Sequence, residues 1–106
     1  MIVVNTEQVS GKRVVRTLGL VRGNTVRARH LGRDILAVFR GLVGGEVHEY
    51  TKLLGESREQ ALDRMCADAK ALGANAVIRT HFATSYVASN MAEILAYGTA
   101  VVLEEE

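Results

Sequence analysis

The spacing of hydrophobic residues over 47–72 is that of one face of a helix. Gly73 follows this segment directly, and glycine adopts the left-handed conformation just after a helix without a Cβ clash. The pattern therefore predicts one long helix that ends near Leu72. Ser57 and Gln60 form a capping-box pattern, which leaves two shorter helices on either side of Gly55 as the alternative. The predicted helix face contains Val47, Tyr50, Leu54, Ala61, Met65, Ala69 and Leu72.

Two segments after this helix alternate like strands. Residues 76–87 separate into Ala76, Ile78, Thr80 and Phe82 on one face, and Val77, Arg79, His81 and Ala83 on the other. A turn at residues 89–90 leads into residues 91–103, whose first face is mostly small and would let a helix lie close: Ala92, Ile94, Ala96, Gly98, Ala100 and Val102. The second face is mixed and is predicted to meet another subunit: Met91, Glu93, Leu95, Tyr97, Thr99 and Val101.

The hydrophobic pattern of the N-terminal half predicts a strand and a short helix. Residues 13–21 alternate imperfectly, and Gly19 suggests a bulge. Gly23 and Asn24 form a turn signal, after which the chain either extends the strand or forms a small projecting segment. Apolar residues spaced by three and four predict a first helix over 34–43.

The order strand, helix, helix, strand, strand predicts an α+β fold in two layers, with a small antiparallel sheet and helices on one of its faces. The 106 residues are enough for one domain. A three-stranded sheet with apolar residues on both faces has two long edges and an uncovered face. We therefore expect a homo-oligomer in which the sheets form a ring or close on one another.

Composition narrows the class of protein. The chain is 48% hydrophobic and 24% charged, and no apolar run approaches the roughly 20 residues of a membrane helix. We see no signal peptide, and the single cysteine, Cys66, agrees with a reducing cytoplasm. Residues 1–53 carry nine Lys/Arg and four Asp/Glu, whereas residues 54–106 carry four and eight. The two halves should attract each other. Aromatic residues do not interleave with the N-terminal arginines, which argues against nucleic-acid binding.

Several motifs resemble those of the YbjQ family of small uncharacterised bacterial proteins. They are Arg33, Asp34 and Ile35 leading to Gly44 and Gly45, then Tyr50 and Thr51, residues 58–62, residues 72–77 (LGANAV), and Glu93 and Ile94 with residues 97–101 (YGTAV). The resemblance covers nearly the whole chain. It implies a dodecin-like β-α-β-β subunit, a homopentamer, a label of heavy-metal binding and no established activity.

The residues that could bind a heavy-metal ion are His81, His48 and Cys66. Soft ions are bound by several converging thiolates or imidazoles, and these three residues, like His30, are far apart in the sequence. One ligand per subunit could still become five around a five-fold axis. The pattern nevertheless favours Cys66 as a small packed hydrophobe, His48 as a surface residue and His81, the best candidate, as a satisfied or solvent-facing histidine.

Arg79, His81, Glu93 and Tyr97 could line a polar pocket at a subunit boundary, where they would bind an anion or act as acid and base. A cross-strand Arg–Glu pair is more usually structural. The sequence therefore favours a non-enzymatic homo-oligomer that binds a metal ion or small ligand at its subunit interfaces. Two alternatives stay open. One is a small enzyme whose interface pocket uses Arg79, His81 and Glu93, and the other is a scaffold that binds an acidic partner through the basic N-terminal half.

Overall fold

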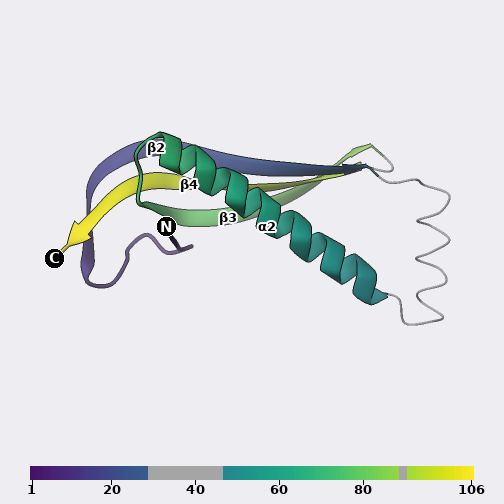
Figure 1. Ribbon diagram of the computed structural model, residues 1–106, viewed down its shortest axis with the longest axis horizontal. Helices are drawn as coiled ribbons and strands as arrows, with labels where there is room; N and C mark the ends of the chain where they lie inside the picture. Colours follow the sequence, from purple (N-terminus) through teal and green to yellow (C-terminus); the bar gives the residue numbers. More distant parts are fainter. Residues whose placement is uncertain (29–46, 89–90) are drawn as a thin grey trace.

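The computed structural model describes residues 1–28, 47–88 and 91–106. The elements are β1 (Ile2–Val3), β2 (Lys12–Ala28), α2 (Val47–Ala71), β3 (Ala76–Ala88) and β4 (Met91–Glu105). The strands form one sheet in the order β1-β3-β4-β2, and α2 crosses one of its faces (Figure 1). The predicted two-layer α+β class is confirmed. The helix predicted over 34–43 and the turn predicted at 89–90 lie outside the described residues.

The sheet has four strands rather than three. Ile2 and Val3 of β1 pair in parallel with Ala76 and Val77 of β3, whereas β3, β4 and β2 pair antiparallel. The expectation of a purely antiparallel sheet was therefore wrong. It missed β1 because a strand of two residues is too short to be recognised from alternation in the sequence. In the described residues, no helix is both long and apolar enough to cross a membrane.

Strand β2 runs without a turn through Gly23 and Asn24, which pair with Ala96 and Leu95 of β4. The turn signal was therefore misleading, and of the two alternatives after it, the extension of the strand is confirmed. A Cβ atom on Gly23 would lie 2.3 Å from the carbonyl oxygen of Ala61 and 2.3 Å from the amide nitrogen of Met65. This glycine is needed because the main chain of α2 passes close to the strand.

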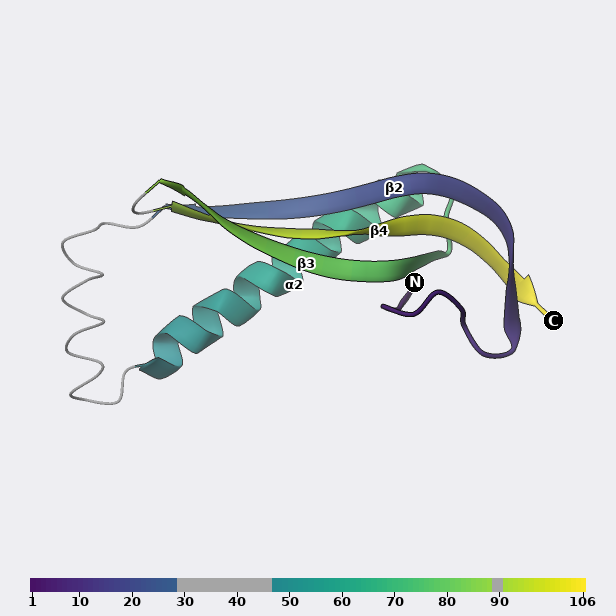
Figure 2. The ribbon, with the colours of Figure 1, turned by 180° about the vertical axis from the view of Figure 1, so that it is seen from behind.

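The predicted bulge at Gly19 is confirmed. The pairing of β2 with β4 shifts register between Thr17 and Gly19, and Gly19 has a φ of +117°. A second shift lies between Val14 and Arg16. Bulges increase the local bend of a strand, and β2 curves strongly at this end of the sheet (Figure 2).

Helix α2 is one continuous helix, and its end confirms the role predicted for Gly73. The N–H of Gly73 donates to the carbonyl of Lys70 at 3.0 Å, and the N–H of Ala74 donates to the carbonyl of Ala69 at 3.1 Å. Gly73 has a φ of +88°. These two bonds form a Schellman motif, and Ala69 and Ala74 belong to the same buried cluster. The chain thus turns directly from the helix into β3.

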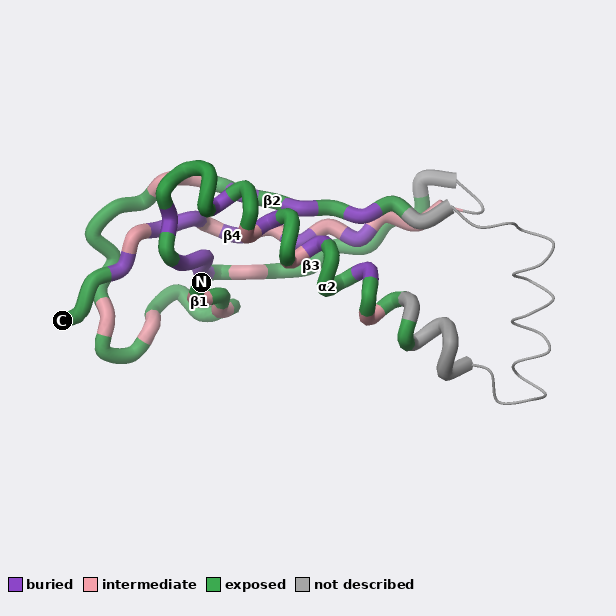
Figure 3. The backbone as a smooth tube through the Cα atoms, viewed as in Figure 1, coloured by how far each residue is buried: buried purple, intermediate pink, exposed green. Residues whose placement is uncertain are grey.

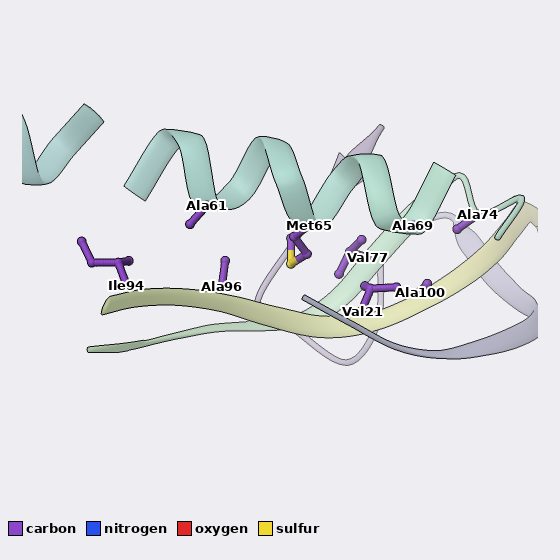
Figure 4. Close-up of a cluster of buried hydrophobic side chains, with 9 residues drawn as sticks. All are labelled: Val21, Ala61, Met65, Ala69, Ala74, Val77, Ile94, Ala96 and Ala100. Carbon is purple, nitrogen blue, oxygen red and sulfur yellow. The ribbon is translucent and has the colours of Figure 1, made fainter. Parts of the chain in front are cut away.

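The main core lies between α2 and the sheet. Buried residues recur at every fourth position of the helix, at Ser57, Ala61, Met65 and Ala69, which is one narrow face (Figure 3). Ala61, Met65 and Ala69 meet small and β-branched residues of the sheet (Figure 4). The predicted small face of β4 is confirmed by Ile94, Ala96 and Ala100 in this cluster; the sheet's other members are Val21 and Val77.

Of the predicted helix stripe, Ala61, Met65 and Ala69 are buried, whereas the described residues on either side of them are not. Leu54 and Leu72 are 44% and 49% exposed, and the N-terminal end of α2 diverges from the sheet (Figure 1). Near the point of divergence, the buried hydroxyl of Thr25 donates to the carbonyl of Ser57 at 3.3 Å. This polar contact ties β2 to the helix where the apolar packing thins.

A second apolar cluster covers one end of the opposite face. Residues Ala76, Ile78, Val101 and Leu103 are buried there beneath Ile2, Val4 and Val9 of the N-terminal segment. The rest of that face carries more exposed residues. We call this remainder the open face; it consists of Leu20, Arg22, Asn24, Val26, His81, Ala83, Ser85, Glu93, Leu95 and Tyr97.

Candidate functional site

A β-bulge in β3 decides which side chains reach the open face. Between the pairs that Ile78 and His81 make with β4, two residues, Arg79 and Thr80, lie opposite Gly98 alone. Arg79 has a φ of +51°, which is uncommon for a residue other than glycine. An extra residue in a strand reverses the alternation beyond it.

The faces predicted for β3 are therefore wrong beyond Ile78. His81 lies on the same side of the sheet as Ile78, although regular alternation places them on opposite sides. Phe82 pairs with Ala96 and so lies on the side that carries α2. Without the bulge, His81 would be opposite Ala96, and the bulge moves it opposite Tyr97.

Gly98 of the YGTAV motif leaves room for this bulge. A Cβ atom at Gly98 would lie 2.7 Å from Cγ1 of Val77 and 2.9 Å from the carbonyl oxygen of Ile78. A larger residue would push β3 and β4 apart at the point where the strands are already irregular. The motif therefore shapes the open face without contributing a side chain to it.

His81 and Tyr97 form the one ring contact found among the described residues. Their ring centroids are 5.7 Å apart, and the planes are inclined by 37°. His81 is exposed and Tyr97 is half-buried. The imidazole nitrogens and the phenol hydroxyl are thus presented on the open face by two paired strands.

Arg79 and Glu93 bind different partners. The Arg79 guanidinium lies 2.9 Å from the Glu7 carboxylate, and its main-chain N–H donates to the carbonyl of Thr6 at 3.0 Å. Asn24 donates its side-chain N–H to Oε2 of Glu93 at 3.1 Å. Of the four residues suggested for a polar pocket, the fold brings His81 and Tyr97 together, whereas Arg79 turns toward the N-terminal segment and Glu93 toward β2.

The possible heavy-metal ligands do not converge in one chain. Cys66 is half-buried on α2 and packs against the main core, so the sheet separates it from His81. The side chain of His48, and all of His30, lie outside the described residues. In the ranges 1–28, 47–88 and 91–106, no three His, Cys, Asp or Glu residues are placed to hold a metal ion together. The residues described in one chain do not fit a metal centre.

The basic and acidic halves of the chain meet along β2 and β4, as the charge pattern predicts. Lys12 pairs with Glu105, and the Arg13 guanidinium lies 3.6 Å from the Glu104 carboxylate. Glu104 and Glu105 therefore belong to β4 and pair with the start of β2. Two of the N-terminal basic residues already have acidic partners within the same chain.

Sequence reasoning missed the residues that hold this region in place. Glu7 and Asn24 bind the two charged candidates, and Leu20, 68% exposed, places an apolar side chain on the open face. No local spacing reveals these contacts, because each depends on the register of strands that are distant in the sequence. The only sequence signal for a bulge at Arg79 is that the alternation of polar residues in β3 does not match the alternation in β4.

These features define a small two-layer α+β domain that carries the His81–Tyr97 pair on an open sheet face. The sequence model of the YbjQ family, described as "Putative heavy-metal-binding", matches residues 1–104. The chain belongs to this family.

Similar proteins occur beyond bacteria. A UPF0145 protein of the bacterium Dehalococcoides mccartyi is 56% identical over 104 residues, covering 98% of this chain and all of the relative. Archaeal UPF0145 proteins are as similar: that of Thermococcus kodakarensis is 56% identical and covers 100% of this chain and 94% of the relative. That of Halorubrum lacusprofundi is 61% identical, covering 93% and 95%. The expectation of a bacterial family is too narrow.

A solved structure has the same fold. It is a protein of unknown function from Pediococcus pentosaceus, assigned to the DUF74 family, with a TM-score of 0.67 and 13% identity over 98% of both chains. At this identity the likeness concerns the arrangement of helix and strands alone.

Proposed function

We propose that this chain is a non-enzymatic homo-oligomeric protein that binds a metal ion or a small ligand at the interfaces between its subunits. The observation that carries the proposal is the composition of the open face. Leu20 and Val26 are 68% and 45% exposed on the same side of the sheet as the His81–Tyr97 pair. Exposed apolar residues beside a few polar groups are typical of surfaces that bind a partner or a ligand.

The ligand site needs more than one copy of the chain. One chain offers His81 as its exposed imidazole on the open face, with no second His or Cys among the described residues of that face. Rotational symmetry would repeat His81 in every subunit, and a ring of five, which the family resemblance implies, would supply five imidazoles. Imidazole suits zinc, copper and nickel ions. A small anion is the other ligand, which the imidazole N–H groups in this arrangement could bind.

The geometry supports an enzyme less well. Arg79 and Glu93 are already bound to Glu7 and Asn24, so neither is directed at His81. The scaffold alternative is weakened in the same way by the partners of Lys12 and Arg13. We infer a cytoplasmic location from Cys66, whose half-buried thiol has no second cysteine in the chain with which to form a disulfide.

Native mass spectrometry of the untagged protein, purified from cells without added metal, tests the proposal. We expect an oligomer, five copies if the ring is correct, with a reproducible extra mass that elemental analysis can identify. His81→Ala should lose the extra mass and keep the oligomer. Cys66→Ala is the matched control, because Cys66 lies on the other side of the sheet. A monomer at micromolar concentration would overturn the proposal, and an empty oligomer would overturn its ligand-binding part.

A further inference from the structure

The outer edge of β3 is covered along its first part only. Ile2 donates its N–H to the carbonyl of Asn75 at 3.3 Å, and Val4 donates to the carbonyl of Val77 at 3.0 Å. Val4 also accepts from the N–H of Thr80 at 3.0 Å. Beyond Thr80, over residues 81–86, no strand or loop in the described part of the chain pairs with this edge. The main chain of this stretch is left open to another strand.

The main-chain N–H and C=O groups of successive strand residues point alternately to the two sides, which shows which residues of 81–86 turn them outward. Thr80 points its N–H outward to Val4, so Phe82, Thr84 and Tyr86 turn their main-chain N–H and C=O outward as well. The hydrogen bonds at the β2 edge lead to the same assignment of outward residues in β3. Arg22 points its N–H away from β4, so its neighbour Tyr97 bonds across to β3 at His81 instead. Three consecutive outward positions are enough for a short antiparallel ladder.

Within the described residues, the other edge of the sheet is protected in part, whereas residues 81–86 of β3 are not. On β2, the carboxylate of Asp68 accepts from the N–H of Arg22 at 3.3 Å, and Arg64 donates to the carbonyl of Asn24 at 2.6 Å. Residues 81–86 (HFATSY) contain no Lys, Arg, Asp, Glu or Pro. Natural proteins guard exposed edges with charges, proline or a covering segment, so an unguarded edge is suited to pairing.

We propose that the outer edge of β3 is a docking surface for the same edge of a second copy of this chain, paired antiparallel about a two-fold axis through Thr84. In this register Thr84 lies opposite the partner's Thr84, and Phe82 lies opposite the partner's Tyr86. Aromatic pairs and Thr–Thr pairs are among the favourable cross-strand contacts. The strand is therefore complementary to itself.

The exposed aromatic residues support this occupant. Phe82 and Tyr86 are 45% and 85% exposed, because α2 packs mainly over β2 and β4 and leaves the same side of β3 uncovered. A two-fold contact would bring two Phe82 and two Tyr86 side chains together on that side. Phe82, Thr84 and Tyr86, the three residues with outward main-chain groups, are also the residues that face one another in this register.

This interface goes beyond the proposed ligand function, since it exists with or without a ligand. A two-fold contact gives an even number of subunits. If it is added to a five-fold ring, it joins two rings into an assembly of ten. The number of subunits therefore separates the two proposals.

Disulfide cross-linking tests the contact and its register. Cys66→Ala first removes the single native cysteine. In that background, Thr84→Cys places a thiol on the axis, where paired Cα atoms are about 5.5 Å apart and within reach of a disulfide. Mild oxidation should convert most of the protein to a cross-linked dimer on a non-reducing gel. Ala83→Cys and Ser85→Cys should each give little cross-link alone and much more when the two chains are co-expressed, because residue 83 faces residue 85 of the other copy.

A charge on the axis gives an independent readout. Thr84→Lys should halve the native mass at micromolar concentration, because two ammonium groups would face each other across the axis. Thr17→Lys is the control, since Thr17 is an exposed strand residue on β2, and it should keep the parent mass. An odd number of subunits without cross-linking of Thr84→Cys would overturn this interface and leave the proposed function standing. A cross-linked dimer of constant, unliganded mass would support the interface and contradict the ligand.

Discussion

The side-chain amide of Asn75 pairs with both main-chain polar groups of Leu103. Its Nδ2 donates to the Leu103 carbonyl at 2.9 Å, and the Leu103 N–H donates to its Oδ1 at 2.7 Å. The main-chain N–H of Asn75 also donates to the carbonyl of Val101 at 3.2 Å. The residue just before β3 thus extends the ladder with β4 through its side chain. The asparagine of the LGANAV motif therefore has a structural role at the junction of helix and sheet.

Replacing Asn75 with aspartate keeps the acceptor and removes the donor. A carboxylate oxygen would then face the Leu103 carbonyl, where Nδ2 now lies at 2.9 Å. We expect Asn75→Asp to lower the free energy of unfolding by about 1–2 kcal/mol at pH 7, because a partly buried acceptor loses its partner and meets a negative charge. Urea denaturation at a fixed protein concentration measures the change, since assembly contributes to apparent stability.

Asn5 provides the matched control for this substitution. It is an exposed asparagine in the N-terminal segment, and its conversion to aspartate changes the same atoms without disturbing a described strand pairing. We expect Asn5→Asp to stay within about 0.5 kcal/mol of the parent protein. Equal losses for the two variants would show that the Asn75–Leu103 pair does not contribute to stability.

Gly73 is expected to tolerate substitution poorly for a conformational reason. Its φ is +88°, and a Cβ atom there would have no atom within 4 Å. The cost of Gly73→Val is therefore strain in the left-handed conformation and not a collision, and we expect a loss of about 1–3 kcal/mol. Gly73→Asn should cost less, because asparagine enters this conformation more easily. Thermal melting of both variants checks the order.

Gly55 should respond in the opposite way. It lies inside α2, and a Cβ atom there would also have nothing within 4 Å. Alanine lowers the conformational entropy lost on helix formation, so Gly55→Ala should stabilise the protein by about 0.5–1 kcal/mol. Destabilisation by Gly55→Ala would mean that this part of the helix packs against something, for example another subunit.

Gly23 tests the close approach of α2 to β2. A Cβ atom there would lie 2.3 Å from two main-chain atoms of the helix, and the helix main chain cannot move away without opening the core around Met65. We expect Gly23→Ala to cost about 3 kcal/mol or more by overpacking. Urea denaturation gives the value, and Gly55→Ala serves as the control for an added methyl group in open space. A loss below about 0.5 kcal/mol, the range of ordinary surface substitutions, would contradict this packing.

Local signals predicted the parts of the fold that depend on one segment. The spacing of Ala61, Met65 and Ala69 predicted the buried face of α2, and Gly73 predicted its end. Gly23 shows the limit of such signals, because glycine favours a turn and also permits close packing of two elements. Only the position of α2 above the strand distinguishes the two roles. The pairing of β1 with β3 depends in the same way on residues about 75 positions apart.

The sequence identified residues of the candidate site but not how these residues are arranged. His81 and Tyr97 were both identified, but the alternation of β3 also grouped His81 with Arg79. The bulge places Arg79 beside Glu7 and moves His81 into register with Tyr97. One extra residue in a strand exchanges its faces, and such a residue leaves no periodic signal in a segment of 13 residues. The neighbours of a strand residue therefore follow from pairing and not from its own sequence.

Arg79 separates backbone strain from charge pairing at this bulge. Its φ of +51° is accessible to glycine without strain, whereas its ion pair with Glu7 joins two side chains that are 59% and 69% exposed. An exposed pair contributes about 0–1 kcal/mol. We therefore expect Arg79→Gly to leave the free energy of unfolding within about 1 kcal/mol of the parent, and Arg79→Val to lower it by about 1–3 kcal/mol, because a β-branched residue is strained at positive φ.

Glu7→Gln is the control, because it removes the charge pair alone. It should match Arg79→Gly within about 1 kcal/mol in urea denaturation. If Arg79→Gly and Arg79→Val were equally destabilised, the contacts of the arginine side chain, and not the left-handed backbone, would be what holds the bulge.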